Sequence, residues 1–118
     1  MRELLNHIVA HPIGAFSFLV LAAALEAYGD SWFQSGLYRA SGIGRILALV
    51  GGGLLLAAYG LVVNAPRWEF GKLIGVYVAF FFLLAQIIAR VRFGQSPTFP
   101  ILMGGALIVA GGIVVSFG

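Results

Sequence analysis

The sequence has no cysteine and very little charge. Without cysteine the chain forms no disulfide, offers no thiolate nucleophile and lacks the ligand of most structural zinc sites. Charged residues make up only 9% of its 118 residues, whereas a soluble domain has about 25%. The seven lysines and arginines stand apart rather than in a run, so no basic tract for nucleic acid is present. We therefore expect no nucleic-acid partner, and we predict no metal, no cofactor and no enzymatic activity.

Apolar residues dominate the chain instead, at 61% of the sequence. A single core of this size could not bury so much apolar surface, because small domains leave a large fraction of theirs exposed to solvent. The solvent must therefore be lipid. A hydrocarbon core of about 30 Å requires about 20 apolar residues per helix. Four stretches meet this requirement, at 13–34, 46–64, 71–91 and 99–117.

The segments between these stretches are short and contain glycine or proline, so consecutive helices should run antiparallel. The sequence thus predicts an all-α integral membrane protein, with a four-transmembrane-helix up-down bundle over residues 13–118. Residues 1–12 mix apolar and polar side chains in an amphipathic pattern that ends at Pro12. We expect this N-terminal segment to lie in the plane of the membrane interface.

Lysine and arginine are almost evenly divided between the two ends of the predicted bundle, three against four. The first group is Arg2, Arg67 and Lys72, and the second is Arg39, Arg45, Arg90 and Arg92. Cytoplasmic flanks normally carry an excess of these residues. The near equality is compatible with insertion in both orientations, whereas the two closely spaced arginines of the second group would favour a single one.

Glu26 is the most informative residue of the sequence. At a rise of about 1.5 Å per residue from Ile13, it lies roughly 20 Å into the first predicted span, near the bilayer midplane. An ionised carboxylate there costs several kcal/mol, and intramembrane acids usually serve ion or proton pathways. Asp30 follows one turn later on the same face. The alternative for both acids is a structural pairing with Arg39, Arg45 or a partner subunit.

Tyr77 is the strongest candidate for a partner of Glu26. It lies at mid-depth in the aromatic third span and has a hydroxyl that requires a hydrogen-bond partner. A cation bound at Glu26 would be stabilised by a ring face as well as by the carboxylate. We predict a proton- and substrate-binding site formed by Glu26, Tyr77 and Asp30. The alternative is that the aromatic residues serve packing alone.

Glycines recur in the second and fourth predicted spans. Small residues let helix backbones approach closely where lipid provides no hydrophobic drive for helix association. We expect the run Gly51 to Gly53 to serve packing, with a hinge as the alternative. In the fourth span, glycines recur at an interval of seven residues, 104 to 111 and 105 to 112. This spacing predicts a flat face on which another helix packs.

Several motifs resemble those of the small multidrug resistance transporters, including their YnfA-like branch. Glu26-x-x-Gly29 resembles the single membrane glutamate of that family, followed by a glycine one turn later. Other similar segments are Ser35-Gly36-Leu37-Tyr38-Arg39, Gly75-Val76-Tyr77-Val78, Phe93-Gly94-Gln95 with Pro100-Ile101, and Gly104-x-x-Leu107-Ile108-x-x-Gly111. The second span departs from the family pattern because Tyr59 is its only aromatic residue, and Asp30 is an addition.

The resemblance implies an antiparallel homodimer in a bacterial inner membrane. Its two Glu26 carboxylates would bind either protons or a small cationic substrate, and this competition would couple their opposite movements. The dimer would pack through the fourth span, at Gly104, Leu107, Ile108 and Gly111. Two other functions remain open: a non-transporting membrane subunit of a larger complex, and one half of a lipid or lipid-sugar flippase.

Overall fold

The computed structural model describes residue 2 and residues 12–118, and the described part contains helices and no β-strand. Four helices follow one another: α2 (Pro12–Tyr38), α3 (Gly42–Val63), α4 (Phe70–Phe93) and α5 (Phe99–Ser116). Among the described residues, three helices are long and apolar enough to cross a membrane, namely α3, α4 and α5. They indicate a multi-pass membrane protein. The predicted amphipathic segment, apart from Arg2 and Pro12, lies outside the described residues.

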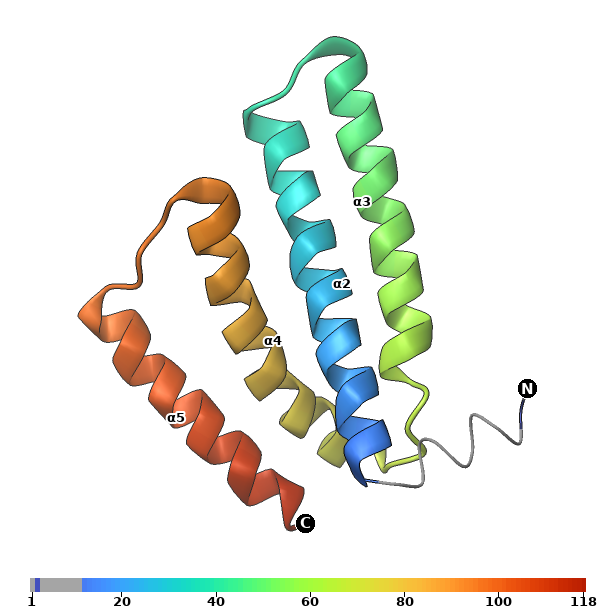
Figure 1. The fold of residues 1–118 in the computed structure, drawn as a ribbon, viewed down its shortest axis with the longest axis vertical. Coiled ribbons are helices and arrows are strands. Elements are labelled where there is room, and N and C mark those ends of the chain that lie inside the picture. Colours follow the sequence, from blue (N-terminus) through green and yellow to red (C-terminus); the bar gives the residue numbers. More distant parts are fainter. Residues whose placement is uncertain (1, 3–11) are drawn as a thin grey trace.

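The four helices lie side by side in the order α3, α2, α4 and α5, and their chain direction alternates from α2 to α5 (Figure 1). The helix α2 packs against α3 on one side and α4 on the other, whereas α5 packs mainly against α4. The molecule therefore consists of two helical hairpins, α2–α3 and α4–α5, which meet along the contact between α2 and α4.

Glycines let α3 approach α2 closely. A Cβ atom at Gly52 would lie 3.0 Å from the carbonyl oxygen of Gly29, and one at Gly51 would collide with the indole ring of Trp32. A Cβ at Gly53 would meet no atom of another described helix within 4 Å. Packing thus accounts for the first two glycines of the run, because their missing side chains make room for α2.

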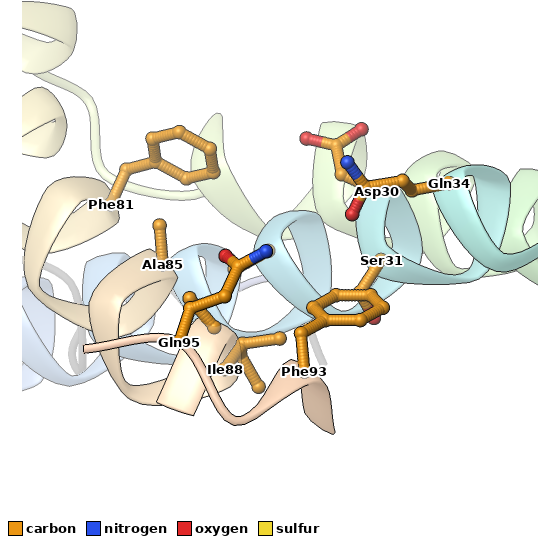
Figure 2. A pocket seen from close by; sticks show the side chains of 10 residues that line it. Asp30, Ser31, Gln34, Phe81, Ala85, Ile88, Phe93 and Gln95 are labelled. Carbon is orange, nitrogen blue, oxygen red and sulfur yellow. The ribbon is translucent and has the colours of Figure 1, made fainter. Parts of the chain in front are cut away.

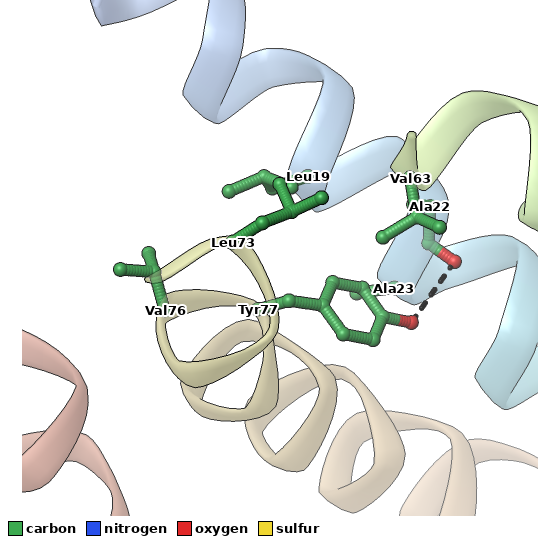
Figure 3. Close-up of a cluster of buried hydrophobic side chains, with 7 residues drawn as sticks. All are labelled: Leu19, Ala22, Ala23, Val63, Leu73, Val76 and Tyr77. Atoms are coloured by element: carbon green, nitrogen blue, oxygen red, sulfur yellow. Dashed lines mark hydrogen bonds between the residues drawn. The ribbon is translucent and has the colours of Figure 1, made fainter. Parts of the chain in front are cut away.

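The most buried side chains lie where α2, α3 and α4 meet. This cluster consists of Leu19, Ala22, Ala23, Val63, Leu73, Val76 and Tyr77 (Figure 3). Small residues of α2 leave room there for the ring of Tyr77, which reaches across from α4 and is only 3% exposed. The tyrosine hydroxyl is thereby carried into an apolar environment, where it needs a polar partner.

The helix α4 ends at a glycine that redirects the chain. Gly94 has a φ of 64°, in the left-handed region that residues with a Cβ rarely adopt. The backbone N–H of the next residue, Gln95, donates to the carbonyl oxygen of Ala89 at 3.1 Å. This turn holds Gln95 close to the end of α4 and, as described below, beside α2.

Candidate functional site

The carboxylate of Glu26 and the hydroxyl of Tyr77 are in direct contact. The Tyr77 hydroxyl donates a hydrogen bond to Glu26 Oε1 at 2.9 Å, and it also lies 3.4 Å from the carbonyl oxygen of Ala22 (Figure 3). Glu26 is half-buried, and Tyr77 belongs to the buried cluster. The structure therefore brings together the two residues that the sequence places at a similar depth in different helices.

A row of aromatic rings adjoins this contact. The ring centroid of Tyr77 lies 5.6 Å from that of Tyr59 in α3 and 6.1 Å from that of Phe81, one turn further along α4. Tyr59 is not among the site residues predicted from the sequence. Its position in the sequence could have indicated this. Tyr59 lies four residues before the end of α3, and Tyr77 lies seven residues after the start of α4 at the same end of the molecule.

Asp30 lies apart from this contact and lines a cavity of about 250 Å³ between α2 and α4 (Figure 2). Three further polar residues line it: Ser31 and Gln34 from α2, and Gln95 from the turn after α4. Its apolar wall comes from α4 and includes Phe81, the ring that also neighbours Tyr77. The predicted site of three residues is thus divided into two adjacent places, linked by Phe81.

Neither acid forms an ion pair within the described part of the chain, so the predicted alternative of pairing with Arg39 or Arg45 is not what the protomer shows. The guanidinium carbon of Arg39 lies 4.4 Å from the centroid of the Phe93 ring. The Nε of Arg45 donates to the carbonyl oxygen of Gly36 at 3.0 Å. Both arginines are therefore engaged at the end of the helices, away from the carboxylates.

Arg92 connects the two hairpins at that same end. It donates a hydrogen bond to Ser35 Oγ at 2.9 Å, and its guanidinium carbon lies 5.3 Å from the ring centroid of Tyr28. Ser35 and Tyr28 belong to α2, whereas Arg92 belongs to the last turn of α4. A second polar contact between α2 and α4 therefore exists, separate from the one between Glu26 and Tyr77.

The glycines of α5 face two different environments. A Cβ atom at Gly105 would collide with the Phe82 ring, and one at Gly112 would lie 2.7 Å from the Cβ of Ala79, so this pair packs against α4. A Cβ at Gly104 or Gly111 would meet no atom of another helix within 4 Å in the described part of the chain. The single flat face predicted from the spacing is thus two faces, of which one is occupied within the protomer. The second face includes the predicted dimer residue Leu107, which is 73% exposed, whereas Ile108 is partly buried.

No protein-family model, curated protein or solved structure matches this chain. Among the described residues, no group of three or more histidine, cysteine, aspartate or glutamate side chains could hold a metal ion. A carboxylate beside a phenol hydroxyl and aromatic rings is instead suited to a proton or an organic cation.

Proposed function

We propose that the chain is a proton-coupled exporter of small cations that acts as an antiparallel homodimer in a bacterial inner membrane, in the manner of the small multidrug resistance transporters that its motifs resemble. The observation that supports this proposal most directly is the hydrogen bond between Tyr77 and Glu26. It places an acid that has no ion-pair partner among the described residues beside aromatic rings, in a multi-pass membrane protein. Such an acid is costly in lipid and is typical of ion or proton pathways.

The proposal includes a fourth membrane span, formed by α2. This helix has 27 residues and is about 40 Å long at about 1.5 Å per residue, which exceeds a hydrocarbon core of about 30 Å. It lies between α3 and α4, both of which are apolar enough to span. A helix held between two spans would cross with them, and Glu26 then faces α4 through its hydrogen bond to Tyr77 rather than lipid.

Coupling in this scheme follows from competition at one carboxylate. A proton and a cation cannot occupy Glu26 together at full affinity, since protonation removes the charge that attracts the cation. The Tyr77 hydroxyl orients the carboxylate through its hydrogen bond, and the rings of Tyr59 and Tyr77 provide faces for an organic cation. If only the occupied forms change their access from one side to the other, inward proton movement drives outward cation movement.

The dimer is assigned to the open glycine face of α5. Among the described residues, no atom outside the local backbone of α5 would lie within 4 Å of a Cβ at Gly104 or Gly111, so a second copy could approach the backbone closely there. Gly111→Leu should abolish the dimer in mild detergent, as measured by chemical crosslinking or native mass. Gly53→Leu is the matched control, because that glycine also has open space around it but lies on α3. A dimer that persists in Gly111→Leu would remove this face from the interface.

The functional test uses purified protein in liposomes with a pH gradient and a permanently charged organic cation. Glu26→Gln should abolish cation-driven proton release and coupled flux while leaving the dimer intact. Glu26→Asp should retain binding with a shifted pH dependence. Glu69→Gln serves as the control, since Glu69 precedes α4 and is exposed. If Glu26→Gln exchanges protons for the cation at the parent rate, another group carries the proton and the proposal fails.

The open face of α5 also supports one other candidate, a non-transporting membrane subunit that binds a larger complex through this helix. That function does not require the charge of Glu26. It would be favoured over transport if the Glu26→Gln variant still assembled into its complex in cells while the Gly111→Leu variant did not.

A further inference from the structure

The cavity beside Asp30 has polar groups that the scheme above does not use. The side chains of Asp30, Gln34 and Gln95 all line it, and none of the three forms a hydrogen bond within the described residues. They come from two elements, α2 and the turn after Gly94, so the fold assembles them rather than a local sequence motif. One carboxylate and two carboxamide groups with free acceptor oxygens are suited to a ligand that carries several N–H donors.

The opposite wall of the same cavity is apolar. It is formed by α4 through Phe81, Ala85, Ile88 and Ala89. A ligand that fits both walls has a charged donor group at one end and methylene groups that lie along the apolar wall. A bare metal ion or a compact polar cation would leave this wall without contacts.

The two carboxylates are separated by one helical turn. Glu26 and Asp30 are four residues apart on α2, a rise of about 6 Å, and the Phe81 ring neighbours both places. A molecule that reaches from the cavity past Phe81 toward Glu26 can therefore present one cationic group to each acid. The methylene groups between its ends would contact the aromatic ring.

We propose that the preferred substrates are aliphatic diamines, whose two ammonium groups bind Glu26 and Asp30 while the connecting chain lies along the apolar wall of α4. This inference rests on the proposed function, because it takes Glu26 as the exchanging carboxylate. Asp30 acts in it as the specificity-determining group. The ammonium group bound at Asp30 also donates hydrogen bonds to the carboxamide oxygens of Gln34 and Gln95.

The test compares two amines of equal carbon number, putrescine with two ammonium groups and butylamine with one. Binding to the purified dimer in detergent is measured by calorimetry at a pH where both amines are protonated. The parent protein should bind putrescine at least about tenfold more tightly than butylamine, since the second charge adds a charge-assisted contact. Asp30→Asn should reduce the affinity for putrescine to that for butylamine and leave butylamine binding unchanged, which also shows that the variant is folded. Asp30→Glu should keep the preference for the diamine.

Equal affinities of the parent for the two amines, or a preference that persists in Asp30→Asn, would overturn the inference. These results are distinguishable from failure of the proposed function. A protein that exchanges protons for a monovalent organic cation in liposomes without preferring putrescine refutes the diamine assignment alone. A protein whose Glu26→Gln variant exchanges at the parent rate refutes the exchanger, and the diamine assignment falls with it.

Discussion

Two adjacent glycines of α5 allow the packing between α4 and α5 to be tested by a single methyl group. Alanine at Gly105 places a Cβ against the ring of Phe82, in collision with one ring carbon and 2.6 Å from Cζ. Alanine at Gly104 places the same group in open space. Both substitutions improve helix propensity by about 1 kcal/mol, so this contribution cancels in their comparison.

The expected difference follows from the movement that the ring must make. Carbon atoms in ordinary contact are about 3.5 Å apart, and the Phe82 ring must therefore shift by about 1 Å to accept the methyl group. Overpacking of this kind costs about 1–3 kcal/mol. We expect the protomer of Gly105→Ala to be less stable than that of Gly104→Ala by this amount.

The two variants are compared by unfolding in mixed micelles of a mild detergent and dodecyl sulfate, followed by circular dichroism. The protein is diluted until it is monomeric. Contacts of Gly104 with a second copy then do not contribute to the measured free energy of unfolding. Gly112→Ala and Gly111→Ala repeat the comparison one heptad later, where Ala79 replaces Phe82 as the neighbour. Equal stability within both pairs would refute the assignment of Gly105 and Gly112 to the contact with α4.

Three further expectations concern other parts of the molecule. Tyr77→Phe keeps the ring but removes the donor to Glu26, and should weaken cation binding by a factor of about ten or less. Equilibrium titration measures this affinity, and an unchanged value would show that the hydroxyl is not needed. Gly51→Val should destabilise the α2–α3 contact by about 1–3 kcal/mol through collision with Trp32, as read by denaturation, whereas Gly53→Val should have little effect. Two lysines added in the loop 65–69 should drive most copies into one orientation, as read by a reporter at the carboxyl terminus; a single orientation before the addition would exclude the antiparallel dimer.

The sequence predicted the helical stretches well, because apolar runs of this length have few other structures open to them in lipid. It also indicated Tyr77 as a partner for Glu26, because a tyrosine hydroxyl inside a span requires a polar partner. It could not show which side of α5 faces α4. Consecutive residues in a helix differ by 100° in direction, so spacing alone cannot distinguish the pair 104 and 111 from the pair 105 and 112.

The cavity beside Asp30 was beyond prediction for a different reason. Its lining requires the contact between α2 and α4, together with the left-handed turn at Gly94 that holds Gln95. Neither feature has a signal in the local sequence that specifies which side chains meet. Tyr59 was omitted because one aromatic residue in an aliphatic helix carries no periodicity, although its depth matched that of Tyr77.

The contact between α2 and α4 joins the two hairpins, and the candidate site lies on this contact. Tyr77 belongs to one hairpin and Glu26 to the other, so their hydrogen bond crosses the seam along which α2 and α4 meet. In the proposed exchanger, a proton or cation that binds Glu26 would change this hydrogen bond and so weaken or strengthen the contact between the two hairpins at that level. A second polar contact across the same seam, the hydrogen bond from Arg92 to Ser35, involves neither acid. If the proposed exchange takes place at Glu26, we expect it to tilt one hairpin against the other about this second contact rather than to deform either hairpin.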